Sequence, residues 1–220
     1  MNGSAQNLVR LLGASGLIVA AAAALNFMVD PLQFFRPAHF FAAMYSQDSR
    51  LQDAGLIRSQ DFDTVFMGTS LAIHFRQSDI DRMLGVKSLK LALNGSSSRE
   101  QVFVLAAALE RHPKRVLWEI DDWIFHDVPD IDSNVYLPAD LYRGNARGVA
   151  GYLLSGRMAR ESAWIMARSV PPLKPVVARL TSDAIFKFPI SSVDDINALR
   201  PDFDVAAAYN EKRADRKSVV

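Results

Sequence analysis

The stretch Asp63-Thr-Val-Phe-Met-Gly-Thr-Ser70 decides the fold class and holds the strongest candidate for a reactive side chain. Residues 64–67 are rich in β-branched and aromatic side chains and are bounded by turn-forming residues, which predicts a buried strand. Gly68 and Ser70 follow at once, so the serine is expected at the carboxyl end of that strand, where open α/β sheets bind their ligands. We therefore predict Ser70 as a nucleophile. The alternative is a serine that only caps or forms a turn.

Helical and extended patterns alternate after this strand, which predicts an α/β fold with a mainly parallel sheet. The expected elements are a helix at 77–84 capped by Ser78 and followed by Gly85, a strand at 88–93, a helix capped by Ser98 that runs to about 111, and a strand at 115–120. A short helix at 48–57, helical segments between 141 and 170, and a strand at 184–190 complete the prediction.

Length and composition limit the function classes. The 220 residues suffice for a sizeable core, and a formal net charge of +1 gives no electrostatic basis for binding nucleic acid. The absence of cysteine excludes disulfides, thiolate catalysis and cysteine-ligated metals. The acidic residues between Asp121 and Asp132 do not have the spacing of a calcium-binding EF-hand loop. We therefore expect no metal, no cofactor and no nucleic-acid partner.

Residues 11–29 form an uncharged apolar segment long enough to cross a bilayer, which takes roughly 20 residues. Arg10 precedes this segment, so the positive-inside rule places the N-terminus in the cytoplasm and the main domain in the periplasm or outside the cell. The alternatives are a cleaved signal peptide and a core helix. The expected organisation is a transmembrane anchor at 1–30, a connector at 31–60 and an α/β domain at 61–220. The connector's aromatic residues suit either a membrane interface or packing onto the domain.

Three loops are expected at the carboxyl edge of the sheet, and together they hold the candidate site: Gly68-Thr69-Ser70, Asn94-Gly95-Ser96-Ser97, and the segment from Asp121 to His126. A serine nucleophile needs a base, usually a histidine, with an orienting carboxylate, and hydrogen-bond donors for the oxyanion. Four histidines are present, and two of them, His74 and His126, lie after strand ends. Each could instead be an ordinary loop histidine.

The order of these features resembles the SGNH/GDSL hydrolase superfamily. An apolar N-terminal segment precedes a strand ending in Gly68-Thr69-Ser70, the next strand leads to Asn94-Gly95, and a third ends at Asp121. The layout is most similar to membrane-anchored bacterial proteins of cell-surface polymer acylation, such as the D-alanine transfer protein of teichoic acid. The resemblance covers about residues 1–125 and implies a flavodoxin-like three-layer α/β/α fold. It also implies Ser70 as nucleophile, the N–H groups of Ser70 and Gly95 as oxyanion donors, and Gly68, Thr69 and Asn94 in the substrate site.

The chain departs from that pattern in two places. Glu119-Ile-Asp-Asp-Trp123 stands where the superfamily usually has Gly-x-Asn, and no histidine follows His126, where an Asp-x-x-His motif is usual. Either the domain is shortened at its C-terminus and lacks the base, or the base comes from elsewhere in the chain, in which case His126 is the predicted base and Asp122 its orienter. The predicted function is an esterase or O-acyltransferase on a cell-surface glycan, with a membrane-bound acyltransferase as a possible partner. The alternative is a non-catalytic binding or scaffold protein anchored in the same membrane.

Overall fold

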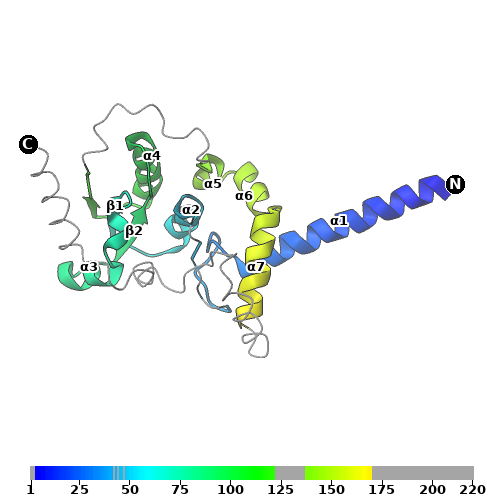
Figure 1. Ribbon diagram of the computed structural model, residues 1–220, viewed down its shortest axis with the longest axis horizontal. Helices are drawn as coiled ribbons and strands as arrows, with labels where there is room; N and C mark the ends of the chain where they lie inside the picture. The colour runs from blue at the N-terminus through cyan, green and yellow to red at the C-terminus, as the bar shows by residue number, and fades with distance from the viewer. Residues whose placement is uncertain (1–2, 42, 44, 47, 122–136, 170–220) are drawn as a thin grey trace, which may run out of the picture.

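A computed structural model describes residues 3–41, 43, 45–46, 48–121 and 137–169. Figure 1 shows a long N-terminal helix that projects from one end of a compact α/β body. The predicted base His126 and its orienter Asp122 lie outside the described residues, as does the strand predicted at 184–190.

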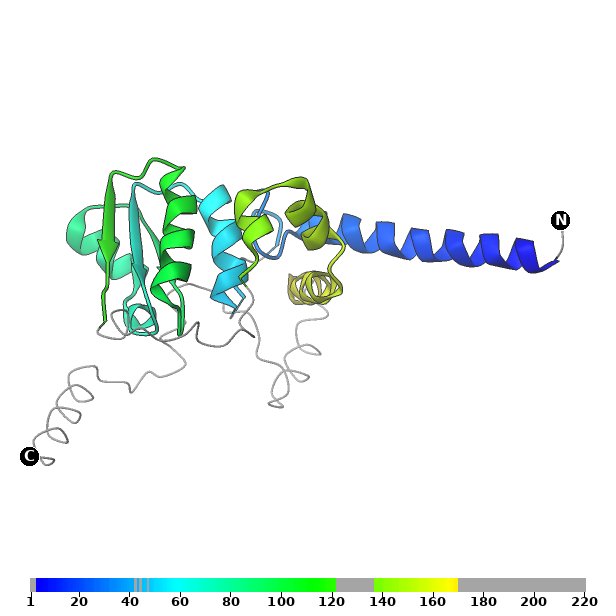
Figure 2. The same cartoon turned by 90° about the horizontal axis from the view of Figure 1, so that it is seen from above.

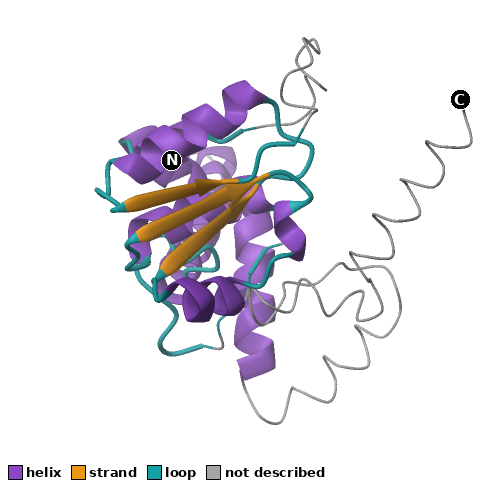
Figure 3. Cartoon of the chain, turned by 90° about the vertical axis from the view of Figure 1, so that its left-hand side faces the viewer, coloured by secondary structure: helices purple, strands orange, loops and turns teal. Residues whose placement is uncertain are grey.

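The sheet confirms the predicted α/β class. Strands β1 (Thr64–Gly68), β2 (Ser88–Ala92) and β3 (Arg115–Trp118) are parallel and lie in the order β2-β1-β3. All five residues of β1 are buried, as expected for the central strand of a parallel sheet. Figures 2 and 3 show that the strands run across the direction of the N-terminal helix, not along it.

Helices pack on both faces of this sheet. On one face, α3 (Gln77–Leu84) and the short 3₁₀ helix η1 (Ala72–His74) cover an apolar cluster that includes Phe66. On the other face, α2 (Ser49–Ser59) and α4 (Ser98–Leu109) cover the larger cluster that contains Val65 and Met67 (Figure 2). Neighbouring residues of β1 therefore enter different cores, which is the period of two expected of a strand.

The helix ends differ from the prediction at two N-caps. Arg76, and not Ser78, occupies the N-cap of α3. Ser97, and not Ser98, caps α4 through a capping box with Glu100. The predicted C-terminal glycine of α3 is confirmed, because Gly85 has a φ of +61°, which glycine adopts without strain.

The N-terminal helix α1 (Gly3–Val29) is long and apolar enough to span a membrane. Its side chains are exposed from residue 4 to residue 21, so the long apolar stretch is not a core helix of the described structure. Only its last two turns contact the body, where they pack against α6 (Ala146–Leu153) and α7 (Gly156–Ser169). The short helix α5 (Ala139–Arg143) precedes these two.

The predicted connector contributes to the main core. Ala54, Leu56 and Ile57 of α2 are buried in the same cluster as the sheet residues. Of its aromatic residues, Phe34 is 3% exposed and packs within the core, whereas Phe40 is 85% exposed. Gly55 allows the close approach, because a Cβ there would overlap the backbone carbonyl of Leu32.

Candidate active site at the carboxyl edge of the sheet

The three strands end side by side, so their following loops meet at one edge. The carbonyl of Gly68 accepts a hydrogen bond from Leu93 N at 2.9 Å, and the carbonyl of Met67 accepts one from Glu119 N at 2.8 Å. These bonds continue the ladder of β1 by one residue on each side. The three loops therefore meet at one edge, as the sequence predicts, and the structure adds that the loop after β1 lies between the other two.

Two acidic side chains of the loop after β3 accept hydrogen bonds from Thr69, at the start of the loop after β1. Glu119 accepts a hydrogen bond from the backbone N–H of Thr69 at 3.2 Å, and Asp121 accepts one from the Thr69 hydroxyl. Gly68 makes this approach possible, because a Cβ at Gly68 would lie 2.5 Å from Glu119 Oε2 and 2.6 Å from the Cβ of Ala72. The sequence predicts a site role for Gly68 and Thr69, and the structure gives both a clear part in positioning the backbone.

Ser70 lies just beyond this contact and is exposed. Among the residues that the structure describes, no hydrogen bond uses the backbone N–H of Ser70 or of Gly95. Gly95 has a φ of +61°, and no heavy atom lies within 4 Å of a Cβ built there, so glycine is favoured by backbone conformation and not by crowding. Within the described residues, adjacent loops thus hold an exposed serine and two backbone N–H groups that make no hydrogen bond.

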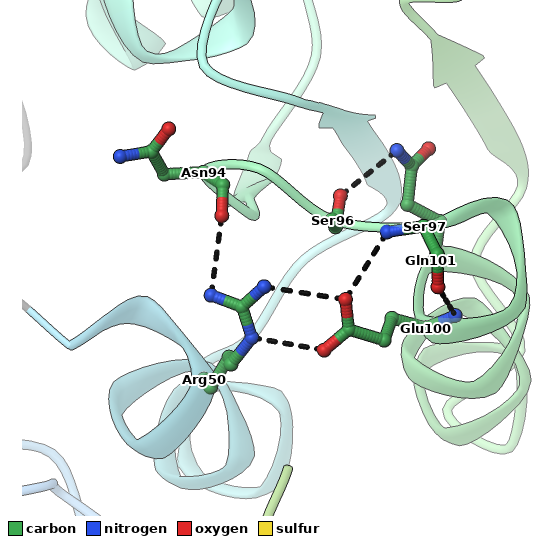
Figure 4. Close-up of polar contacts among 6 residues, drawn as sticks. All are labelled: Arg50, Asn94, Ser96, Ser97, Glu100 and Gln101. Carbon is green, nitrogen blue, oxygen red and sulfur yellow. Dashed lines mark hydrogen bonds and ion pairs between the residues drawn. The ribbon is translucent and has the colours of Figure 1, made fainter. Parts of the chain in front are cut away.

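The loop after β2 is held by a polar network, shown in Figure 4. Arg50 of α2 donates to the Asn94 carbonyl at 3.2 Å and makes a two-pronged ion pair with Glu100, at 2.9 and 3.2 Å. Glu100 also accepts from Ser97 N as part of the capping box. The side chain of Asn94 points away from this group and is exposed (Figure 4). The network fixes the backbone of the loop and leaves the amide available to a ligand.

A second set of hydrogen bonds ties the same loop to β3. Gln101, which is fully buried, donates to the hydroxyl of Ser96 at 2.9 Å and accepts from the indole N–H of Trp118 at 2.7 Å. Each group that this contact removes from water thus has a partner, which buried polar groups require. The loop after β2 is therefore braced from α2, from α4 and from β3.

Sequence reasoning missed the bracing residues Arg50, Gln101 and Glu119. Of the contacts that hold this loop, only the capping box of Ser97 and Glu100 has a signal in the sequence, because a serine followed three residues later by glutamate is typical of one. The catalytic role of this site stays a prediction. Gly68, Thr69, Asn94 and Gly95 lie at the same edge of the sheet as Ser70. The predicted base His126 and its orienter Asp122 lie outside the described residues. His74, the other candidate base, lies in η1, and its backbone N–H donates to Leu71 O.

One buried carboxyl group with an altered pKa, that of Asp53, lies in α2, in the layer of helices packed on the sheet. Burial raises the pKa of Asp53 well above its ordinary value, and Lys90 opposes that rise. Burial, with the nearby Asp53 second, likewise raises the pKa of the Tyr142 phenol. One oxygen of Asp53 and the Tyr142 hydroxyl have no hydrogen-bond partner among the described residues. Both side chains are buried, at 4% and 5% exposure.

Metal chemistry has no evident support in the described part of the chain, where no group of three or more His, Asp or Glu side chains is arranged to hold an ion. Comparison with protein-family models, with curated proteins and with solved structures gave no match.

Proposed function

We propose that this chain is a membrane-anchored, extracytoplasmic SGNH-hydrolase-like protein that acts as an esterase or O-acyltransferase on a cell-surface glycan. The observation that carries the proposal is the exposed Ser70 in the loop after the central strand, beside the loop that holds Gly95. Within the described residues, no hydrogen bond uses the backbone N–H of Ser70 or of Gly95. Such donors stabilise the oxyanion that forms when a serine attacks a carbonyl. The parallel sheet with helices on both faces supports a flavodoxin-like three-layer arrangement for the whole domain.

The proposed reaction has two steps. The Ser70 oxygen attacks the carbonyl carbon of an acyl ester, the ester C–O bond breaks, and the proton from Ser70 passes through a base to the departing alcohol. Water or a sugar hydroxyl then attacks the acyl-serine, releases Ser70 and completes hydrolysis or transfer. A serine hydroxyl is a weak nucleophile without a base. We therefore propose His126 as the general base and Asp122 as the carboxylate that orients it.

A second candidate is a non-catalytic scaffold or binding protein of the same membrane. The contacts at the edge favour it in one respect: Glu119 and Asp121 both bind Thr69, and within the described residues neither is hydrogen-bonded to Ser70. In that case the exposed Ser70 and Asn94 would bind a glycan, and a membrane-bound acyltransferase would supply the chemistry.

Acyl transfer to Ser70 separates the two candidates. The full chain in detergent micelles is incubated with a chromogenic acetyl ester, and both hydrolysis and an acetyl adduct on Ser70 are measured, the latter by peptide mass spectrometry. We expect Ser70→Ala to abolish both, and Ser98→Ala, which removes another exposed serine, to change neither. His126→Ala should slow the reaction without removing Ser70. Turnover that persists in Ser70→Ala would exclude Ser70 as the nucleophile. The absence of an acetyl adduct in the parent protein and in every variant would favour the non-catalytic scaffold.

A further inference from the structure

The end of α1 is built into the folded body. Asn26 is fully buried and donates to the carbonyls of Leu153 and Ser155, at 2.9 and 3.2 Å, while its own oxygen accepts from the hydroxyl of Ser162 at 3.0 Å. Val29 packs against Ile165 of α7 one turn later. A polar side chain with all its bonds satisfied inside this contact fixes the direction in which α1 leaves the body.

The chain just after α1 is fixed as firmly. Asp30 has a φ of +52°, and its carboxyl group accepts from the backbone N–H groups of Phe34, Phe35 and Arg36 at 2.8–3.0 Å. Tyr152 of α6 donates to the same carboxyl group at 2.8 Å. The joint between helix and body therefore contains no free linker, and the body has a defined orientation relative to α1.

The free length of α1 fits the bilayer. The exposed stretch from residue 4 to residue 21 rises about 27 Å, close to the ~30 Å of a hydrocarbon core. Arg10 falls within this stretch, about 9 Å from residue 4, so its long side chain must extend toward the headgroups on the N-terminal side. The remaining turns of α1 are those that pack on α6 and α7. Figures 1 and 2 show these two helices at the end of the body from which α1 emerges, with α7 lying across the direction of α1. With α1 in a membrane, α7 lies along the membrane surface.

The composition of α7 and its neighbours suits an anionic lipid surface. Residues 139–169 contain five arginines against two acidic residues, a net charge of +3, whereas the whole chain has a net charge of +1. Arg160 and Ala163 are exposed on the side of α7 away from its buried Met158 and Ile165, and Met166 and Arg168 are exposed on its two opposite flanks. Basic and apolar side chains together on one helix are typical of helices that lie in the interface.

We propose that α7 lies on the headgroups of the bilayer that α1 crosses, with Arg160 and Arg168 binding the phosphates of anionic phospholipids. The proposal rests on the membrane-spanning role of α1 and is independent of any chemistry at Ser70. It sets the distance between the carboxyl edge of the sheet and the membrane. Each arginine near an anionic surface strengthens attachment to that surface about fivefold, which corresponds to ~1 kcal/mol.

Single-cysteine labelling tests this directly, because the chain contains no cysteine. The full chain is reconstituted in nanodiscs with a fluorophore at Leu17→Cys, Ala163→Cys, Met166→Cys or Val102→Cys, and quenching by lipids spin-labelled in the headgroup or the acyl chain is measured. Leu17 of α1 is the control for spanning and should be quenched from the acyl chain. The two α7 labels should be quenched most strongly from the headgroup, and Val102 of α4 should be quenched by neither lipid.

Lipid selectivity is measured with the same labels. Spin-labelled phosphatidylglycerol should quench the α7 labels several-fold more than spin-labelled phosphatidylcholine, and Arg160→Gln with Arg168→Gln should bring that ratio to one. Arg111→Gln, an exposed arginine of the sheet half, should leave the ratio unchanged. Quenching at Leu17 without quenching on α7 would overturn the proposal, and so would equal quenching by the two lipids. No quenching at Leu17 would instead refute the membrane anchor of the proposed function.

Discussion

Replacing Asn26 by leucine tests whether the end of α1 belongs to the folded body. The two side chains are similar in size, so the change mainly removes three hydrogen bonds of 2.9–3.2 Å. At ~1 kcal/mol for each bond, the free energy of unfolding should fall by about 3 kcal/mol. Ser162, which is fully buried, is also left without its partner. For a chain of this size the midpoint of thermal unfolding should fall by about 6–12 °C.

Thermal unfolding of the full chain in detergent micelles, followed by near-ultraviolet circular dichroism, measures this change. Asn94→Ala is the matched control, because that side chain is exposed, and we expect it to alter stability by no more than ~0.5 kcal/mol. In a double-mutant cycle, Asn26→Leu and Ser162→Ala should couple by about 1 kcal/mol. A midpoint for Asn26→Leu equal to that of the control would refute the reasoning, because α1 would then be only tethered to the body.

Three further perturbations follow from the packing. Gly68→Ala places a methyl group 2.5 Å from a glutamate oxygen and should cost ~1–3 kcal/mol in chemical denaturation, whereas Gly151→Ala, with open space around it, should not destabilise the chain. The free energy of unfolding of Asp53→Asn should increase relative to that of the parent protein as the pH rises above 3.8. The reason is that the pKa of the buried Asp53 is raised in the folded parent, which therefore loses stability as the pH rises from 3.8 through that pKa. Melting curves at several pH values check this, and a difference independent of pH would contradict it. Gln101→Leu leaves the Trp118 indole N–H and a serine hydroxyl unpartnered, so a loss of ~2–4 kcal/mol is expected, and unchanged stability would argue against the network.

The regular elements of the sheet domain could be predicted because their signals are local. The strand predicted at 64–67 is β1 with one more residue, and the helix predicted at 77–84 matches α3. A run of β-branched and aromatic residues, or a helical pattern ended by Gly85, carries its own structural preference. The parallel direction of the strands could be predicted because strands and helices alternate along the chain, and few connections between such units are allowed.

The parts that could not be predicted depend on partners far away in the sequence. Arg50 meets Asn94 across 44 residues, and Asn26 meets Ser162 across 136. A single asparagine near the end of an apolar segment carries no sign of where its partners lie. At the candidate site, sequence order placed Thr69 and Asp121 at the same edge, but the hydrogen bond between them depends on side-chain geometry that no spacing reveals.

The strands lie across the direction of α1, and this has a consequence for encounter with a substrate (Figures 2 and 3). With α1 upright in a bilayer, the edge that carries Ser70 opens sideways, parallel to the membrane plane. A substrate or partner held in the same membrane would then arrive by lateral diffusion, at a height set by the joint between α1 and the body. The encounter rate would then depend on the number of molecules per unit area of membrane, and dilution of the surrounding solution would leave it unchanged.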